Sequence, residues 1–365
     1  MLSGMYDAIE SYCPDLLWVL AEPLLPAAPR PEQGGGKRRL HPDRAILAAV
    51  VYKGKTGCAW ADVPRSAFGA PRSTLHERFS TWVRGGFFEA LLAAIHNELG
   101  AAEAIGWHRA AIDSVYLRAK SGGEDTGPSP VDRGKSGSKI HLIADEHGLP
   151  LVVEISAANV HDKRLLERLI DRIGPIQGPK GRPRHRPDKL HGDKGYDYAD
   201  CRAALRQRGI IPRIARKGIE SSQRLGRHRW KVERTIAWLD GFRALTIRYE
   251  RKAAHFLAFF TLGAAMTCYK TLAKQANNPI PDVLLSRPPR HPTEEHRGAP
   301  PLCSAPRRHA RGRIGADRWP RNALRRNAPA APDRSGPGAN VGRGAPPGLG
   351  ERSRGGRLGT CDLWS

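Results

Sequence analysis

The feature that most constrains the fold of this chain is a regular change of apolar period between residues 107 and 274. Three short strand-like runs come first, and strand-like and helical runs then alternate in the order β-β-β-α-β-α-β-α-α. Such an order is typical of a sheet covered by helices. The predicted strands are 110–119, 139–144, 151–155, 189–191 and 210–214, and the predicted helices are 162–173, 198–208, 227–239 and 254–274.

Three acidic residues interrupt this pattern. Asp113 lies inside the apolar run of the first strand, Asp193 follows the fourth strand, and Glu233 lies in the helix after the fifth. A buried carboxylate costs free energy unless it is paired with a cation. Mg²⁺ prefers such oxygen ligands, and two ions about 3.5–4 Å apart can serve both the attacking and the leaving oxygen of a phosphodiester. The sequence therefore predicts these three acids as catalytic residues and as ligands of two Mg²⁺ or Mn²⁺ ions.

The element order and the positions of the acids match the ribonuclease-H-like nucleotidyl-transfer fold, an α/β (α+β) class. Each acid also has a plainer explanation. Asp113 would be a buried structural acid bonded to backbone amides, and Asp193 would belong to a glycine-rich turn. Glu233 would pair with Arg229 four residues earlier on the same helix. The three positions together favour catalysis.

The charge of the chain points to a polyanionic partner. The formal net charge is +24 and the pI is about 10.4, and a field of this size attracts nucleic acid. A generally basic surface is the alternative. Basic residues surround the acids, and Lys194, Arg229 and Arg234 are predicted DNA contacts, with salt bridges to the acids as the alternative. Further basic residues follow at Arg243, Arg248 and Arg251. Trp230 and Trp238 are predicted to lie in the core, with base-stacking platforms as the alternative.

Residues 1–100 have a helical pattern throughout and form the predicted N-terminal domain. Helices are expected at 44–53, 59–63 and 74–84, with Asp43 and Ser73 as the N-caps of the first and third. Three short helices in this order resemble a helix-turn-helix unit. A small helical bundle with solvated basic residues is the alternative. The predicted DNA contacts of this region are His76, Arg78 and Arg84.

Residues 275–365 differ in composition from the catalytic region predicted at 107–274. They contain 16 Arg and no Lys, and they are rich in Pro and Gly. A segment without apolar periodicity cannot bury enough surface to offset its chain entropy, so a disordered tail is expected. It is either an arginine-rich arm or a translated extension past the usual end of the gene, and the loss of Lys favours the second.

Cysteine usage and hydropathy predict a cytoplasmic protein with no membrane partner. The six cysteines form no Cys-x-x-Cys pair, which argues against a zinc site and indicates a reducing compartment. No signal peptide is expected. The most apolar stretch, 255–269, is predicted to be too short to span a bilayer and to form a buried helix.

Several motifs in order resemble the DDE transposases of bacterial insertion sequences, in the group typified by insertion sequences four and five. The resemblance covers about residues 10 to 274 and excludes the tail. It is carried by Ala111-Ile-Asp-Ser114, Gly192-Asp-Lys-Gly-Tyr-Asp197, Ile211-Pro-Arg213, His228-Arg-Trp-Lys-Val-Glu-Arg-Thr235, Phe242-Arg-Ala-Leu245 and Arg248-Tyr-Glu-Arg251, and in the leading region by Gly57-Cys-Ala-Trp60 and Arg78-Phe-Ser-Thr-Trp82.

The resemblance implies cutting at terminal inverted repeats and joining of the 3′-hydroxyl to target DNA, with Mg²⁺, by a homodimer or larger assembly on DNA. It maps the catalytic acids onto Asp113, Asp193 and Glu233, and the arginine four residues before the glutamate onto Arg229. Two positions depart from the wider family, which often has a tyrosine and a lysine where this chain has Gly226 and Asp240. A metal-dependent endonuclease that does not join strands, and a DNA-binding protein with an inactive centre, are the competing functions.

Overall fold

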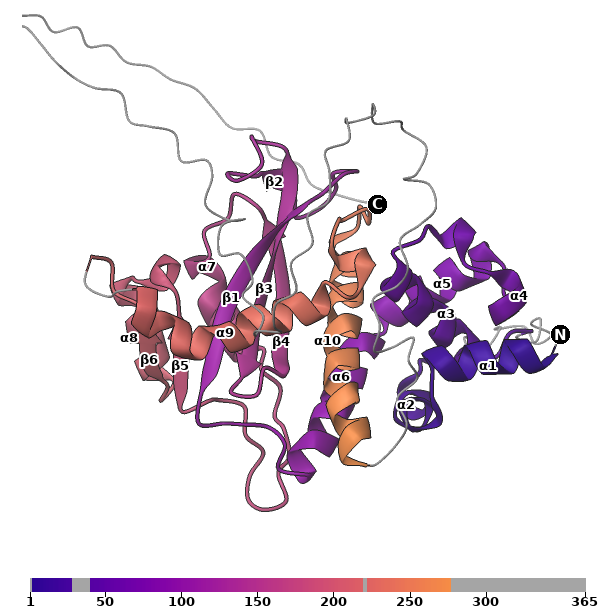
Figure 1. The fold of residues 1–365 in the computed structure, drawn as a ribbon, viewed down its shortest axis with the longest axis horizontal. Helices are drawn as coiled ribbons and strands as arrows, with labels where there is room; N and C mark the ends of the chain where they lie inside the picture. The colour runs from indigo at the N-terminus through magenta and orange to yellow at the C-terminus, as the bar shows by residue number, and fades with distance from the viewer. Residues whose placement is uncertain (1, 28–39, 219–221, 277–365) are drawn as a thin grey trace, which may run out of the picture. The chain divides into compact units, whose positions relative to one another are not determined.

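A mixed β-sheet organises the second half of the chain (Figure 1). The computed structural model describes residues 2–27, 40–218 and 222–276, with only the backbone described at 2–3 and 222–229. The predicted tail, apart from its first two residues, therefore lies outside the described residues. The strands are β1 (Ala110–Arg118), β2 (Gly127–Pro128), β3 (Ser136–Asp145), β4 (Pro150–Ala157), β5 (Lys189–Gly192) and β6 (Ile211–Ile214).

The main strands lie in the order β4-β3-β1-β5-β6. β3 runs antiparallel to both β1 and β4, whereas β5 is parallel to β1 and β6 is parallel to β5. The short β2, which pairs with the start of β3, was not predicted. The remaining strands and the helices between them follow the predicted order, and this mixed sheet with its covering helices confirms the predicted ribonuclease-H-like fold class.

Helices cover both faces of the sheet. On one face, Glu154 of β4 is ion-paired with Arg168, which lies in α7, and with Arg172, which directly follows α7. On the other face, Leu142 of β3 lines a small cavity with Ile236 and Leu239 of α9. Figure 1 shows α9 crossing in front of the strands, with α10 beside them. These helices are α7 (Lys163–Asp171), α8 (Ala199–Gln207), α9 (Ser222–Leu239) and α10 (Ala253–Gln275).

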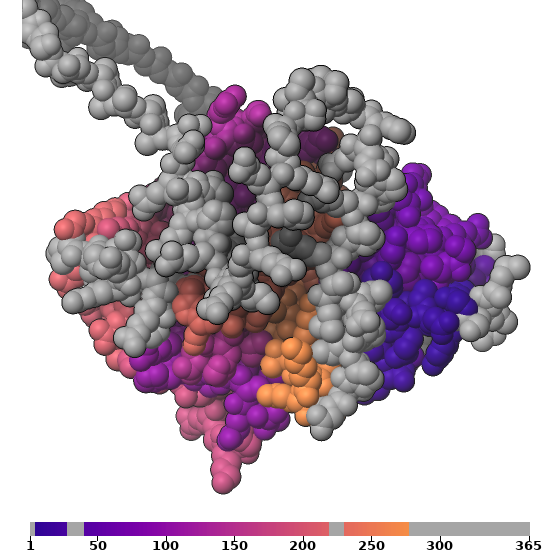
Figure 2. Space-filling view, in the orientation of Figure 1, coloured from indigo at the N-terminus to yellow at the C-terminus, as the bar shows by residue number. Residues whose placement is uncertain are grey.

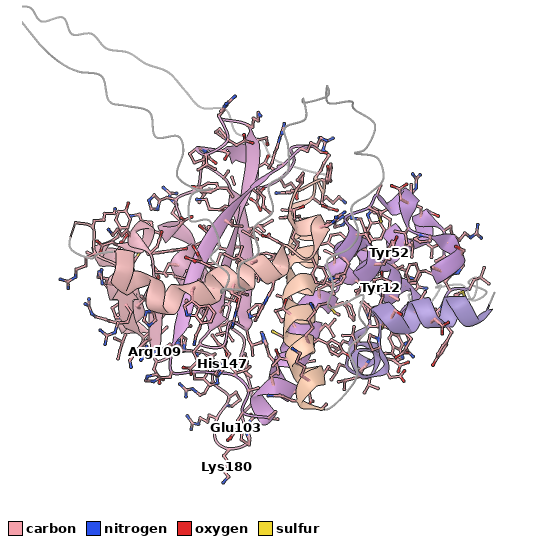
Figure 3. The ribbon with its side chains drawn as sticks, viewed as in Figure 1. Tyr12, Tyr52, Glu103, Arg109, His147 and Lys180 are labelled. Carbon is pink, nitrogen blue, oxygen red and sulfur yellow. The ribbon has the colours of Figure 1, made fainter. Side chains whose placement is uncertain are left out.

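The N-terminal region consists of helices packed around aromatic side chains. Tyr12 of α1 meets Tyr52 of α3 edge to face, with ring centroids 5.2 Å apart (Figure 3), and both rings contact Phe68. The helices are α1 (Leu2–Tyr12), α2 (Asp15–Ala21), α3 (Asp43–Thr56), α4 (Arg65–Phe68), α5 (Arg72–Arg84) and α6 (Phe87–Ala101), with short 3₁₀ helices η1 (Glu22–Leu24) and η2 (Trp60–Asp62).

Two predicted helix caps are wrong. Asp43 is the first residue of α3 and follows the N-cap Pro42, and Ser73 is the second residue of α5, whose N-cap is Pro71. Proline fixes an extended backbone just before each helix and so moves the start of the helix upstream of the polar residue. The polar residue alone therefore does not mark where each helix begins, because the preceding proline sets the boundary.

Helix α10 is the central core helix. It packs against α6 and β4, and Figure 2 shows its orange surface against the magenta surface of the sheet region. It is 23 residues long, and by length and hydropathy alone it qualifies as a membrane span, which corrects the prediction that this stretch is too short. Because 83% of its apolar window is buried inside the protein, it fits the core helix that the sequence predicted.

One glycine brings the N-terminal helices directly against the second half of the chain. Gly57 ends α3 with φ +67°, and a Cβ added there would lie 2.9 Å from the Cβ of Arg243. Arg243 begins the 3₁₀ helix η4 (Arg243–Leu245), which leads into the loop before α10. Because any side chain at position 57 would meet η4, this contact fixes how closely α3 approaches the segment that follows α9.

Candidate active site

Two of the three predicted acids lie on neighbouring segments of the sheet, Asp113 within β1 and Asp193 directly after β5. β1 and β5 are hydrogen-bonded in parallel, with Ala111 opposite His191. Asp113 and Asp193 are each two residues further along, and neighbouring strands are about 4.8 Å apart. The fold therefore places the two aspartates at the same level on adjacent segments of the sheet, although they are far apart in the sequence.

The side chain of Asp113 projects toward the face that α9 covers. Asp113 lies directly opposite Leu142 in the antiparallel β1–β3 pair, and directly opposed residues project from the same face of a sheet. Leu142 lines the cavity under α9. The carboxylate is half-buried, and its Oδ1 accepts a hydrogen bond from the backbone N–H of Ser114 at 2.9 Å.

Asp193 occupies the glycine-rich turn that the sequence indicated. It is the N-cap of the 3₁₀ helix η3 (Lys194–Tyr196), and its Oδ1 accepts from the backbone N–H of Gly195 at 2.9 Å. The turn holds the carboxylate at the end of β5 and leaves its second oxygen, Oδ2, outside this bond. The structural explanation for Asp193 is thus present, and the turn fixes the orientation of its carboxylate.

A buried tyrosine lies near both aspartates. Tyr196 is buried, and within the described residues its hydroxyl has no hydrogen-bond partner. Burial, followed by the charges of Asp162, Asp113 and Asp193, raises the pKa of Tyr196 well above its usual value. Both aspartates therefore lie near one protonated hydroxyl. No sequence pattern indicates a role for Tyr196, because an aromatic residue three positions after an acid also fits ordinary core packing.

Glu233 is not gathered with the two aspartates into a metal-binding cluster. It is exposed on α9, one turn before Ile236, and Ile236 lines the same cavity as Val115 of β1. Among the described residues, no group of three or more His, Cys, Asp or Glu side chains is placed to hold a metal ion. Glu233 has contacts of its own, and its predicted pairing with Arg229 lies outside the described side chains.

The donor set can be compared with what a divalent ion requires. Asp113 in β1 and Asp193 just after β5 provide hard oxygen ligands, and Mg²⁺ commonly uses only one or two protein carboxylates together with water and substrate oxygens. Asp113 and Asp193 therefore fit a divalent ion. A three-carboxylate set that includes Glu233 is not present in the described geometry.

The basic residues predicted around the acids have different surroundings. Lys194 is exposed beside Asp193. The side chain of Arg229 lies outside the described residues. Arg234 donates from Nη2 to the carbonyl of His147 at 2.7 Å, and its guanidinium lies 4.7 Å and 4.5 Å from the ring centres of Trp230 and Trp238. Arg234 therefore has structural contacts, and its contact with DNA stays a prediction.

The core placement predicted for Trp230 and Trp238 is wrong. The two side chains are 46% and 43% exposed. They lie on either side of Arg234 at spacings of four residues, so the guanidinium covers part of each ring. The apolar stripe of α9 that faces the core consists instead of Val232 and Leu239.

Arg248 does not belong to the basic surroundings of the acids. It is fully buried, donating to the Oγ of Ser138 at 2.6 Å and to the carbonyl of Glu250 at 2.9 Å. Its role is to fix the loop before α10 against the sheet, where Ala119 and Arg248 form an isolated parallel bridge.

The three DNA contacts predicted in the N-terminal region also differ. Arg78 is ion-paired with Asp43, and its side chain is only 12% exposed. Arg84 is exposed and donates to the Oγ1 of Thr81 at 3.2 Å. His76 is exposed, with its ring edge-on to Trp60 at 5.7 Å. Arg84 and His76 are therefore accessible, whereas Arg78 holds α5 to the start of α3.

Sequence comparisons decide the family. Residues 109–268 match the family model of the transposase DDE domain, and residues 14–92 match that of a putative transposase of the IS4/5 family. The chain is 48% identical over 149 residues to the putative transposase for insertion sequence element IS402 of Burkholderia cepacia, covering 41% of this chain and 71% of that protein. This chain belongs to the DDE transposases of insertion sequences. The resemblance seen in the motifs is thereby confirmed, and the family is one of metal-dependent enzymes acting on DNA.

This transposase is also similar to a second protein of the same element and to two solved structures. It is 35% identical over 117 residues to the 16.2 kDa protein of element IS402 of Burkholderia cepacia, covering 32% of this chain and 79% of that protein. Among solved structures, a piggyBac transposase synaptic complex with hairpin DNA matches with a TM-score of 0.42 at 9% identity, covering 77% of this chain and 78% of that chain. The catalytic core domain of BIV integrase matches with a TM-score of 0.27 at 13% identity, covering 47% of this chain and 97% of that chain. Because these TM-scores are below 0.5, the family assignment rests on the sequence comparisons.

Proposed function

We propose that this transposase cuts DNA at terminal inverted repeats and joins the freed 3′-hydroxyl ends to target DNA. The observation that carries the proposal is the position of Asp113 and Asp193 at the same level on two adjacent parallel strands, near one buried hydroxyl. Family membership supports a transposase, and the pair of carboxylates of Asp113 and Asp193 supports phosphodiester chemistry beside β1 and β5.

The proposed cofactor is Mg²⁺ or Mn²⁺, in two ions. Bound ions supply charge stabilisation and activate an oxygen nucleophile. Asp113 and Asp193 would hold them, and the bond from Gly195 to Asp193 keeps that carboxylate in place as DNA enters. The hydroxyl of Tyr196, which stays protonated because its pKa is raised, would be available as a hydrogen-bond donor near the two aspartates.

Glu233 is proposed as the third catalytic residue and metal ligand. Its support is the path of α9, which packs on β1 and carries Ile236 against Val115. Glu233 lies one turn earlier on the flank that faces β1, because residues three apart share a helix face. In the described geometry it does not complete a cluster, so its ligation requires a direct test separate from that of the two aspartates.

The proposed partners are the terminal repeats and the target DNA, bound by a homodimer or a larger assembly. Residues 1–100 would act as the DNA-binding domain, residues 107–274 as the catalytic domain and residues 275–365 as a tail. Exposed Lys194, Arg84 and His76 have the accessibility that phosphate contacts need. Arg229, Arg234 and Arg78 complete the proposed set. A cytoplasmic, nucleoid-associated location follows from this function.

The proposed function is tested with purified full-length protein, Mg²⁺ and DNA that carries the ends of its own element. Wild type should cut the ends and join them, and Asp113→Asn, Asp193→Asn and Glu233→Gln should each bind DNA without cutting. Asp240→Asn is the control for Glu233→Gln, because Asp240 is an exposed acid that directly follows the last residue of α9, and it should retain activity. Cutting without joining would replace the proposal with an endonuclease, and cutting by either aspartate variant would refute the site.

A further inference from the structure

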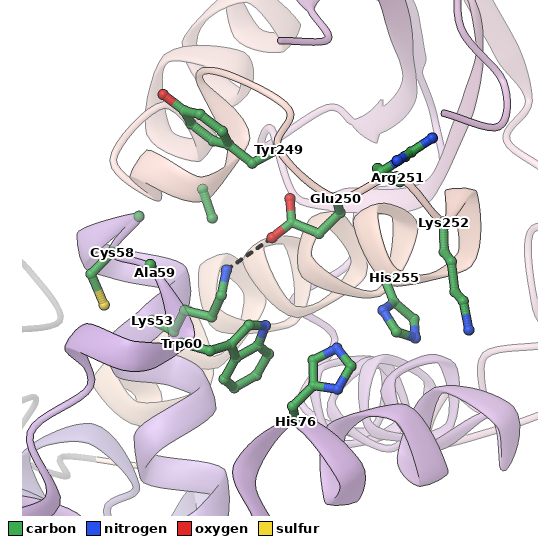
Figure 4. Close-up of a pocket in the computed structure, with 12 residues that line it drawn as sticks. Lys53, Cys58, Ala59, Trp60, His76, Tyr249, Glu250, Arg251, Lys252 and His255 are labelled. Atoms are coloured by element: carbon green, nitrogen blue, oxygen red, sulfur yellow. Dashed lines mark hydrogen bonds and ion pairs between the residues drawn. The ribbon is translucent and has the colours of Figure 1, made fainter. Parts of the chain in front are cut away.

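A cavity of about 530 Å³ lies between the N-terminal helices and the start of α10 (Figure 4). None of the three predicted acids lines it. One wall comes from the end of α3, the following loop with η2, and α5, and the other from residues 244–255. The close approach of Gly57 to Arg243 holds these walls together at one end. Its volume lies within the range of pockets that bind small ligands, about 300–1,000 Å³.

A nearly buried ion pair lies in this cavity. The Nζ of Lys53 is 2.9 Å from Oε1 of Glu250, and the side chains are 6% and 12% exposed. Lys53 also lies over the ring of Trp60 at 5.1 Å and over that of Phe259 at 4.3 Å. The pair presents a fixed donor and a fixed acceptor next to an aromatic face, which is the combination that reads the polar edge of a flat heterocycle.

Aromatic rings continue from this pair toward the opening of the cavity. His76 lies edge-on to Trp60, and His76 and His255 have ring centroids 5.6 Å apart. Figure 4 shows the two histidine rings directed toward each other from α5 and α10. Tyr249, on the other side of Glu250, is 48% exposed. The cavity therefore offers several ring faces and edges to a planar ligand.

The charge of the cavity is positive. Burial, then His76 and Lys252, lower the pKa of His255, with a smaller contribution from Arg84 and an opposing one from Glu250. Arg84 and Lys252 are thus close to the cavity, and Arg251 and Lys252 are exposed at its wall. The one acid among the lining residues, Glu250, is already paired with Lys53. An anion with an attached ring complements these surroundings.

We propose that this cavity binds one unpaired nucleotide of the DNA on which the transposase acts. The base lies against Trp60 with its polar edge at Lys53 and Glu250, and the phosphate lies toward Lys252, Arg251 and His76. Unpaired bases are bound in this way by aromatic faces within basic grooves, and enzymes pay a modest unstacking free energy to extrude them. The inference depends on the proposed function only in taking DNA as the ligand.

Photo-crosslinking tests the site directly. The full chain is mixed in EDTA, so that no cleavage occurs, with 12-nucleotide single strands or fully paired duplexes that carry one 5-iododeoxyuridine. Irradiation of the single strand should crosslink Trp60 or Tyr249, identified by peptide mass spectrometry, and the duplex should give much less product at these residues. Crosslinks that map only outside 53–60, 76 and 244–255 would overturn the proposal.

Affinity measurements with variants give a second readout. Trp60→Leu should weaken single-strand binding about tenfold, because stacking on one aromatic ring is lost, while duplex binding changes little. Trp60→Phe should restore most of the affinity, which separates the ring face from general folding, and Tyr6→Leu, at an exposed aromatic on α1, is the matched control. Equal weakening for single strands and duplexes would contradict the proposal.

The same experiment separates this inference from the proposed function. Asp113→Asn should crosslink as wild type does, because the cavity contains none of the acids. If Asp113→Asn still cuts DNA and the crosslink maps to Trp60, the catalytic assignment falls and the nucleotide site stands. If Asp113→Asn is inactive and no crosslink maps to the cavity, the catalytic assignment stands and the nucleotide site falls.

Discussion

The pair Asp113 and Asp193 in the sheet and the cavity beside α10 are formed in different ways. At the sheet, Asp113 lies within β1 and Asp193 follows β5, and the parallel pairing of these two strands brings them together. At the cavity, Lys53 and Glu250 come from segments 197 residues apart and meet only because helices of the N-terminal region pack against the loop before α10. The first site depends on local patterns and sheet order, and the second depends on tertiary packing.

The two regions should therefore respond differently to substitution. A carboxylate that serves chemistry contributes little to folding, and neutralising it lowers the repulsion between neighbouring acids. A nearly buried ion pair across two packed segments should matter for folding, because removing one partner leaves the other charge unpaired. The predictions below set these two behaviours against each other.

The largest expected effect is on catalysis at the sheet. Asp193→Asn should lower strand cleavage about 1,000-fold or more, since a group that acts in the transition state is lost. Its melting temperature should stay within about 2 °C of wild type, because an Asn side chain can still accept the bond from Gly195. Cleavage rates and thermal unfolding are measured together, with Asp200→Asn, at an exposed acid paired with Lys163, as the control. A strongly destabilised Asp193→Asn would make this acid structural.

The next effect is on stability at the cavity. Lys53→Met should lower the free energy of unfolding by about 3 kcal/mol, because Glu250 loses its nearly buried partner. The double variant Lys53→Met/Glu250→Gln should recover part of the loss. Lys163→Met, which breaks a pair whose side chains are 34% and 63% exposed, should cost less than about 1 kcal/mol. Urea unfolding measures all three, and equal losses for the two lysine variants would remove the contrast between the regions.

A smaller effect concerns the close approach that forms the cavity wall. Gly57 and Gly86 have nearly the same positive φ, +67° and +69°, but an added Cβ meets Arg243 at position 57 and nothing within 4 Å at position 86. Each Gly→Ala change should cost about 1 kcal/mol for the backbone conformation, and Gly57→Ala should cost at least about 1 kcal/mol more for the contact. Equal values in chemical unfolding would show that α3 does not press on η4.

The smallest expected effect is a pH dependence at the cavity. The pKa of His255 is below its ordinary value of 6.5, because of burial and then the neighbouring His76 and Lys252, with Arg84 adding to this and Glu250 opposing it. The unfolded chain therefore binds the proton at higher pH than the folded protein does. The contribution of His255 to stability is complete above pH 6.5 and is lost as the pH falls.

The check is the slope of unfolding free energy between pH 7 and pH 5.5. His255→Gln should reduce this slope, and His185→Gln, at an exposed histidine, should leave it unchanged. A slope unchanged by His255→Gln would mean that His255 titrates alike in both states.

The sequence predicted the order of strands and helices along the second half of the chain, and the position of Asp113 in the first strand and of Asp193 after the fourth, because these depend on period and position along the chain. The five main strands and the four helices of the second half lie within a few residues of their predicted ranges. β2 was missed because two residues have no period, and the helix caps were misplaced because Pro42 and Pro71 determine where α3 and α5 begin.

What the sequence could not predict depends on contacts between distant segments. Arg248 is buried because it bonds to Ser138 in β3 and to the carbonyl of Glu250 in its own loop. Trp230 and Trp238 stay on the surface of α9, where Arg234 covers part of each ring. The cavity itself joins Trp60 and His76 to residues 244–255. No apolar period reports such a meeting, so only the fold reveals it.

The measurement that tests the central claim most directly is metal-directed cleavage of the protein backbone. Fe²⁺ substituted for the proposed ion, with ascorbate and peroxide, should cut the wild-type chain next to residues 113 and 193, and the double variant Asp113→Asn/Asp193→Asn should lose both cuts. Cuts at these positions that persist in the double variant, or cuts found only elsewhere, would contradict a metal site at Asp113 and Asp193.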